Sequence, residues 1–305
     1  MLTSLGNAVL VLDSGNALFR VLGGASDEDK RRAAFVLGAM GELRTAVLGV
    51  GFRDLSAGAE FLSAEAKRAK VQLVSTNLEQ NGKAAFPRST VVERNGVKVA
   101  ILAASGTGEV PGAPGLVGAP SLPALKAELA RLPPRDVTVL LSAAGYEEAM
   151  ALANELSGKI DLVIQSGEFR GTVPPQAVKD VLLLASGQRG QAVGKLSLTL
   201  GAPTGRFTDL NEAARDRELL EHLDRQLATL DGRLKAAVDA EGKKSLAALR
   251  KDMKARRDEQ ARKVKAVQGA RTLQLDWVLL GTDVKDDEAL KARVLEIEPT
   301  YSGLH

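Results

Sequence analysis

The sequence predicts an α/β protein with mixed sheets flanked by helices and an inserted antiparallel helical hairpin. From residue 8 to about residue 200, short β-branched runs alternate with helical stretches, the pattern of a sheet covered by helices. Apolar residues make up 45% of the 305 residues but aromatic residues only 3%, so Ala, Val and Leu must fill the core. Beyond residue 205 the strand pattern stops, and charged residues and Ala predominate to about residue 269.

The α/β part carries nine expected strands and four expected helices. The strands are Ala8–Leu12, Thr45–Val50, Gln72–Thr76, Ser89–Glu93, Val97–Ala103, Val137–Ser142, Leu162–Gln165, Val181–Ala185 and Gly194–Thr199. The helices are Asp27–Glu42, Gly58–Ala69, Ser121–Arg131 and Tyr146–Leu156. Asn95-Gly96 between two strands predicts a tight hairpin, so parallel and antiparallel pairing are mixed. Pro and Gly cluster in Val110–Pro123, which predicts a long loop.

Residues 204–271 are predicted to form the charged, coiled-coil-like hairpin. Its first arm has a heptad seam, Leu220, Leu223, Leu227, Leu230, Leu234 and Ala237. Glu241-Gly242 is expected to interrupt the helix. The second arm has a looser apolar stripe, formed by Leu246, Leu249, Met253, Val264 and Val267. Arg257 and Gln260 stand in this stripe where apolar residues would be expected. Residues 209–241 have a net charge of −4 and residues 242–271 of +8, which favours pairing of the two arms.

Three parts are therefore expected along the chain. Residues 1–203 form the α/β domain and residues 204–271 the hairpin. Residues 272–305 contain a returning strand at Thr272–Leu280 and a short helix at Asp286–Leu295, which dock back on the α/β domain.

Composition narrows the class of protein. The chain has no cysteine, which excludes disulfides and thiolate metal sites and leaves the compartment open. The net charge of +3 is a weak signal for nucleic acid. No apolar run reaches the roughly 18 residues needed to cross a bilayer, so no membrane span is expected. Met1 to Leu12 lacks the charged start and cleavage site of a signal peptide.

Several segments carry a family resemblance in collinear order. They are VLVLDSGN (9–16), AVLGVGFRDL (46–55), LVSTNL (73–78), NGVKVAIL (95–102), VTVLLSAAG (137–145), IDLVIQSGEFR (160–170) and GQRGQAVGKLSL (187–198). Together these resemble the calcineurin-like metallophosphoesterases, in the branch that includes the 5′-nucleotidases, and residues 280–294 are similar to the tail that follows. The resemblance implies an αββα sandwich, two divalent metal ions, hydrolysis of phosphoric esters and an exported, periplasmic location. It also places the family's first strand, with its Asp-x-His motif, before Met1.

Residue by residue, the resemblance implies that the metal ligands are replaced. The position of the bridging aspartate is Asn16, that of the asparagine ligand is Phe52, and that of the catalytic histidine is Arg53. The three later histidine positions are Ala143, Gly167 and Phe169. Asp13 and Asn77 keep the family identity. Asp13, near a ligand position but not itself a ligand, is expected to make a loop hydrogen bond, and Asn77 is expected to cap a turn. The only two histidines, His222 in the heptad helix and His305 at the last position, are not expected to join a cluster.

The remaining charged loop residues leave alternatives open. Arg53, Asp54, Glu168 and Arg170 are expected on two facing loops, as an ion-pair plug or, through Arg53 and Arg170, as an anion site. A phosphoesterase with an unorthodox site would use Asp13, Asp54 and Glu168 with Asn16 as metal ligands.

These observations predict an inactive phosphoesterase homologue that acts as a binding or scaffolding protein. No catalytic residue, metal ligand or cofactor is assigned. The expected partner is a protein or a second copy of the chain, bound through the hairpin, and an anionic small molecule is an alternative ligand. The basic run at residues 251–265 lacks interleaved aromatic residues and faces an acidic arm, so we expect no nucleic acid.

Overall fold

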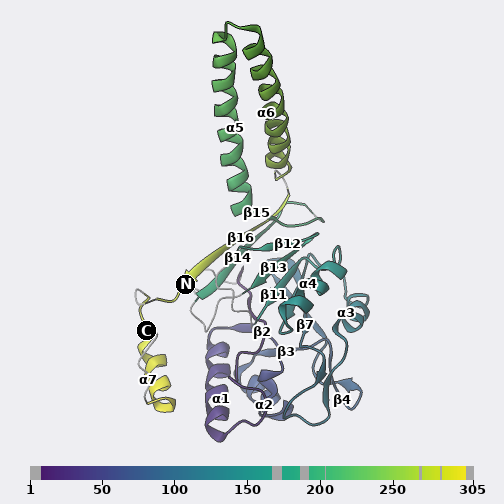
Figure 1. Cartoon of the computed structure of the whole chain (residues 1–305). Coiled ribbons are helices and arrows are strands. Elements are labelled where there is room, and N and C mark those ends of the chain that lie inside the picture. The colour runs from purple at the N-terminus through teal and green to yellow at the C-terminus, as the bar shows by residue number, and fades with distance from the viewer. Residues whose placement is uncertain are drawn as a thin grey trace. The chain divides into compact units, whose positions relative to one another are not determined.

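A computed structural model describes residues 8–166, 174–185, 192–202, 204–267, 270–281 and 284–299 (Figure 1). The chain forms two compact units, Met1–Gly194 with Trp277–His305, and Lys195–Asp276. The predicted α/β class is confirmed. None of the helices in the described ranges is both long and apolar enough to cross a bilayer.

The first sheet of the larger unit is parallel and has three strands. β1 (Val11–Asp13), β2 (Thr45–Gly49) and β3 (Gln72–Val74) lie in the order β1-β2-β3. Helices α1 (Asp27–Glu42) and α2 (Ala59–Ala69) pack on this sheet and on each other. At the start of α1, the Ser26 side chain accepts a hydrogen bond from the N–H of Asp29. The Asp29 side chain accepts one from the N–H of Ser26, which completes a capping box.

The second sheet has six strands in the order β12-β13-β11-β10-β7-β6. Its four central strands are parallel, namely β7 (Val97–Ala104), β10 (Val137–Ser142), β11 (Leu162–Gln165) and β13 (Val181–Ala185). The edge strands β6 (Ser89–Arg94) and β12 (Gln176–Val178) are antiparallel to their neighbours. Asn95 and Gly96, both with positive φ, form the predicted turn between β6 and β7. Helices α3 (Ser121–Leu129) and α4 (Tyr146–Glu155) pack on this sheet.

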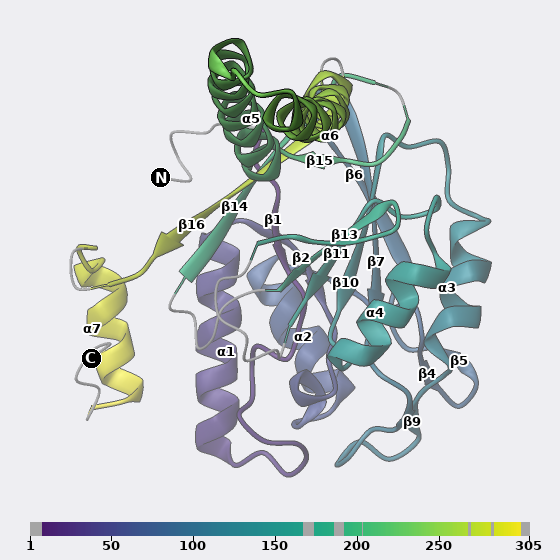
Figure 2. The ribbon, with the colours of Figure 1, turned by 45° about the horizontal axis from the view of Figure 1, so that its top comes forward.

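The two sheets pack face to face. Gly49 of β2 approaches the second sheet so closely that an added Cβ would lie 3.0 Å from the Leu141 side chain and 3.3 Å from that of Ala103. Helices α1 and α2 cover one outer face and α3 and α4 the other (Figure 2). This arrangement is the predicted αββα sandwich, with an aliphatic core.

A small sheet replaces part of the expected loop at Val110–Pro123. Its order is β5-β4-β9-β8, with β4 (Leu78–Gln80), β5 (Lys83–Ala84), β8 (Gly108–Glu109) and β9 (Leu116–Gly118). The prediction missed this sheet because each strand has only two or three residues. Another short element, the 3-10 helix η2 (Arg53–Leu55), follows β2.

The second unit contains two paired 27-residue helices, α5 (Leu210–Ala236) and α6 (Ala240–Ala266). The short strand β15 (Thr208–Asp209) precedes them, and β14 (Ala192–Leu200), β16 (Arg271–Leu279) and β15 form a three-stranded sheet in the order β14-β16-β15. This unit extends beyond the 204–271 segment because the flanking strands belong to its sheet.

The turn of the hairpin lies earlier than Glu241-Gly242, where the sequence predicted it. Three residues, 237–239, separate the helices, and Gly242 is inside the first turn of α6. The carboxylate of Asp239 accepts the N–H of Gly242 at 2.5 Å, so this glycine serves a helix cap instead of breaking the helix.

The seam between α5 and α6 joins leucines with polar pairs. Leu230 is buried, whereas most other seam leucines are half-buried. Asp231 pairs with Arg250, and Asp224 accepts the Nε of Arg257 at 2.7 Å. The pairing of residue 231 with 250 and 224 with 257 shows that the helices run antiparallel. Leu249, predicted in the seam, is instead 47% exposed, because Arg250 takes the inward position.

The C-terminal helix α7 (Glu288–Ile297) contacts α1 in the larger unit. The guanidinium of Arg293 donates to the carboxylate of Glu42 at 2.7 Å and lies 5.3 Å from the centre of the Phe35 ring. Helix α7 is therefore held on the α/β unit by a charged pair and a cation–π contact.

Candidate functional site

The loops that follow β1, β2 and β10 meet at the carboxyl ends of these parallel strands. Asn16 follows β1, Phe52 and Arg53 follow β2, and Ala143 follows β10. Loops at this edge are where α/β proteins place ligand-binding residues. We therefore consider this edge as the candidate site.

Asn16 bridges the three loops. Its backbone has a φ of 59°, a left-handed conformation that asparagine tolerates. Its amide Nδ2 donates to the carbonyl of Ala143 at 3.1 Å, and its Oδ1 accepts the backbone N–H of Arg53 at 3.1 Å. A Cβ on Gly51 would lie 2.3 Å from that Oδ1, so only glycine leaves room for the amide. Three of the residues singled out in the sequence are thus brought together, and the Asn16 amide already has protein partners.

Asp54 organises the loop that contains Asn16. Its carboxylate is fully buried and accepts four backbone N–H groups. Oδ2 accepts from Asn16 at 2.7 Å and Gly51 at 2.8 Å, and Oδ1 from Ala17 at 2.8 Å and Leu18 at 3.1 Å. Four donors match the four lone-pair sites of a carboxylate, which leaves none for a metal ion or an arginine.

The environment of Asp54 acts on its pKa in two directions. Burial raises the pKa of the Asp54 carboxyl to about 6, and the N–H donors oppose this rise. The expected ion-pair plug is wrong for Asp54, since its carboxylate faces backbone N–H groups instead of a guanidinium. Sequence reasoning missed this role because a carboxylate that accepts distant backbone N–H groups leaves no local pattern.

Asp13 makes the loop hydrogen bond that the sequence predicts, whereas Asn77, predicted to cap a turn, binds two distant loops instead. The Oδ1 of Asp13 accepts the N–H of Gly15 at 2.8 Å, and burial raises the pKa of the Asp13 carboxyl. Asn77 is fully buried, and its Nδ2 donates to the carbonyls of Gly106 at 2.7 Å and Ala119 at 2.9 Å. Its Oδ1 accepts the N–H of Ser105 at 2.9 Å. Asn77 therefore holds two loops together by side-chain hydrogen bonds.

Phe52 packs into the protein beside the site. Its half-buried ring packs against the buried apolar cluster that includes Leu48, Leu55 and Leu62. A Cβ on Gly118 would lie 3.1 Å from the ring, and one on Gly106 would lie 3.6 Å from it. The two glycines thus make room for an aromatic side chain where the resemblance places an asparagine ligand.

Arg53 contributes a half-buried cation to this edge. Its backbone N–H is bound to Asn16, whereas its guanidinium has no ion pair within the described part of the chain. The other predicted site residues, Gly167, Glu168, Phe169 and Arg170, lie outside the described residues. Whether Arg53 and Arg170 share an anion therefore stays a prediction.

The residues that the structure describes at this edge do not fit a pair of divalent metal ions. Such a site needs ionised carboxylates, neutral imidazoles or free amide oxygens. Across the described ranges, no three His, Cys, Asp or Glu side chains lie close enough together to hold a metal ion. Side-chain oxygens of Asn16, Asp54 and Asp13 already accept backbone N–H groups.

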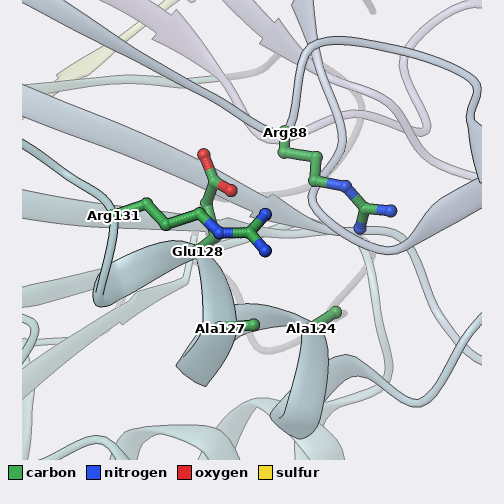
Figure 3. A pocket seen from close by; sticks show the side chains of 5 residues that line it. All are labelled: Arg88, Ala124, Ala127, Glu128 and Arg131. Carbon is green, nitrogen blue, oxygen red and sulfur yellow. The ribbon is translucent and has the colours of Figure 1, made fainter.

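A separate cavity of about 170 Å³ lies beside α3, lined by Arg88, Ala124, Ala127, Glu128 and Arg131 (Figure 3). The Arg88 guanidinium donates to the carbonyl of Thr76 at 2.7 Å and to Glu79 at 2.9 Å. Glu128 accepts the Ser89 hydroxyl at 2.5 Å. Two of its three charged groups are therefore already bound to protein, and no sequence motif pointed to this cavity.

Solved structures of other proteins have folds similar to the αββα sandwich of this chain. No protein-family model matches the chain, and no curated protein sequence matches it. Two solved structures from Thermus thermophilus are similar in fold. The sulfate thiohydrolase SoxB has a TM-score of 0.56 and 22% identity, over 65% of this chain and 37% of that one. A 5′-nucleotidase precursor has a TM-score of 0.54 and 22% identity, over 65% of this chain and 43% of that one.

The chain thus spans less than half the length of either solved structure. At 22% identity these similarities establish the fold and nothing about substrate. Together with the two packed sheets and their outer helices, they show that this chain has a metallophosphoesterase-like fold of the 5′-nucleotidase type.

Proposed function

We propose that this protein is a catalytically inactive homologue of the 5′-nucleotidase-like metallophosphoesterases that acts as a binding or scaffolding protein. The bridge made by Asn16 carries the proposal. At the position that the resemblance gives to a metal-bridging carboxylate, a neutral amide binds the carbonyl of Ala143 and the N–H of Arg53. Hydrogen bonds within the protein thus take the place of metal coordination, and Phe52 adds an aromatic ring beside them.

The test is a metal and activity measurement on the purified chain. After incubation with Mn²⁺ or Zn²⁺ and removal of free ions, we expect no stoichiometric metal by elemental analysis. We also expect no EDTA-sensitive turnover of AMP or p-nitrophenyl phosphate. Two bound metal equivalents with turnover that Asn16→Ala abolishes would instead support the phosphoesterase with an unorthodox site. Circular dichroism shows whether that variant keeps its fold.

The half-buried Arg53 guanidinium favours a second candidate function, metal-free binding of a small phosphate compound. Arginine binds phosphate through two parallel hydrogen bonds, and burial strengthens such a contact. Calorimetric titration with phosphate and AMP should then give a heat of binding that Arg53→Ala removes. Arg20→Ala, an exposed arginine of the loop before α1, is the matched control and should bind normally. Equal binding by both variants would rule out this site.

The paired helices α5 and α6 supply the surface for a protein partner in this proposal. A long two-helix arm presents an extended surface that the α/β unit does not need for its own core. If a partner or second copy binds there, replacing residues 210–266 by a short linker should abolish association while the α/β unit stays folded. Unchanged association in sedimentation velocity would contradict an arm-mediated contact.

A further inference from the structure

The polar contacts in the seam of the hairpin engage acidic side chains that could otherwise neutralise cations on its outer surface. Arg250 and Arg257 face the carboxylates of Asp231 and Asp224 on α5. Gln260 donates to the carboxylate of Asp216 at 2.7 Å. Three of the acids on α5 are therefore engaged inside the seam and do not neutralise the lysines on the outside of α6.

The outer surface of α6 carries what we call the lysine face, Lys243, Lys244, Lys251, Lys254, Arg262 and Lys265. All six side chains are exposed, and none has an ion pair within the described ranges. Lys243, Lys254 and Lys265 are 11 residues apart, close to three helical turns, so they form a row with a spacing of about 16 Å. Asp258, the one acid near this row, lies 3.5 Å from the Arg257 guanidinium.

The charge balance selects the kind of partner. Helix α6 has ten Lys or Arg against four Asp or Glu, although the whole chain has a net charge of only +3. Two such faces would repel each other, so the lysine face does not suit a second hairpin. An extended anionic surface is the complementary partner.

We propose that the lysine face binds the anionic headgroups of a lipid surface. Five of its six cations are lysines, which act as point charges and do not impose the geometry of an arginine fork. Laterally mobile headgroups can match cations spread over about 33 Å of helix. The face has no aromatic side chain for base stacking, which disfavours single-stranded nucleic acid.

The tip of the hairpin provides a second observation. Val238 is 92% exposed in the turn between α5 and α6 and lies close in sequence to Lys235, Lys243 and Lys244. An exposed apolar residue among lysines is the combination that enters the headgroup region of an anionic bilayer. This inference concerns the second unit and does not depend on the proposed loss of metal binding.

Sedimentation of the full chain with lipid vesicles tests the proposal. Vesicles of equal parts phosphatidylcholine and phosphatidylglycerol should bind the protein, and vesicles of phosphatidylcholine alone should not. Changing Lys243, Lys254 and Lys265 to Gln should lower the partition coefficient about 100-fold, because each cation near such a surface contributes about fivefold. The matched control changes three exposed arginines of α5, Arg215, Arg225 and Arg233, to Gln and should change binding by less than about threefold.

The outcomes separate lipid from other polyanions. Added salt should release the protein from the charged vesicles, since screening weakens contacts between exposed charges. Equal binding to neutral vesicles would overturn the proposal, as would equal loss in the α6 and α5 variants. Binding to a DNA duplex without binding to charged vesicles would assign the lysine face to nucleic acid instead. Helicity by circular dichroism confirms that each variant is folded.

Discussion

The edge around Asn16 and the seam of the hairpin differ in how their polar side chains are satisfied. At the edge, the fully buried Asp54 accepts N–H groups of the backbone itself. In the seam, Asp231 and Arg250 pair with each other, and their side chains remain 39% and 41% exposed. Water can replace a lost partner in the seam but not beside Asp54. Similar substitutions should therefore cost far more stability at the edge than in the hairpin.

The largest expected effect is that of Asp54→Ala. It removes a fully buried carboxylate that accepts four backbone N–H groups, and we expect a loss of about 3–5 kcal/mol in the free energy of unfolding. Urea denaturation followed by circular dichroism measures this loss. The control Asp27→Ala removes an acid whose side chain is 94% exposed and should change stability by less than about 0.5 kcal/mol. Similar values for the two variants would contradict the structural role of Asp54.

The second prediction concerns pH. The pKa of Asp54 is about 6 in the folded protein against an ordinary value of 3.8, so the folded state holds this proton more tightly than the unfolded state. The stability that this proton adds is present below pH 4 and is lost as the pH rises to about 6, with a total of about 3 kcal/mol. In urea unfolding across this pH window, Asp54→Asn should not show this decrease in the free energy of unfolding. If the free energy of unfolding of the variant still fell with pH as in the original protein, another group would be responsible.

Two matched glycine substitutions, one in each region, should change the stability of the protein in opposite directions. Gly51→Ala places a Cβ against the Asn16 amide and should destabilise the protein by about 1–3 kcal/mol. Gly232→Ala lies on an exposed position of α5 with no atom within 4 Å, and should stabilise its helix by about 0.5–1 kcal/mol. Thermal unfolding of the two variants measures both signs. Destabilisation by Gly232→Ala would mean that this helix position has a contact of its own.

The smallest effect is expected in the seam. A double-mutant cycle with Asp224→Ala and Arg257→Ala should give a coupling free energy of about 0.5 kcal/mol, because both side chains are partly exposed. This coupling should decrease in high salt, as screening weakens exposed ion pairs. A coupling of several kcal/mol would contradict this difference between the two regions, because the seam would then depend on its polar contacts as strongly as the edge around Asp54 does.

Much of the fold could be predicted because the pattern of apolar residues is local. Helix α1 and strands β10, β11 and β13 have the predicted bounds, since the helix has an N-terminal cap and each strand is a short, nearly continuous apolar run. The hairpin turn was misplaced because Gly242 usually indicates a break, whereas here it binds the Asp239 cap. Leu249 was misplaced because ion pairing turns Arg250 inward, and apolar periodicity does not register ion pairs.

Less of the candidate site could be predicted. The resemblance assigns Asn16, Arg53 and Ala143 to positions of one former metal site, and their loops lie together in the structure, because strand order determines which loops share an edge. It did not indicate that the Asn16 amide would join them or that Asp54 would face the backbone. These contacts depend on the path of the loops in space, including the left-handed backbone at Asn16, and no local residue pattern specifies that path.

The bridge at Asn16 also constrains how this sequence can evolve. Asn16→Asp would set a carboxylate oxygen against the Ala143 carbonyl, which the amide Nδ2 now contacts at 3.1 Å. Histidine at position 143 would gain little until positions 16, 52 and 53 had also changed. Under the proposed function, Asn16→Asp, as a first step back toward a metal-binding sequence, lowers the stability of the bridge and restores no activity. The stability of the bridge would then oppose the return of metal ligands during evolution.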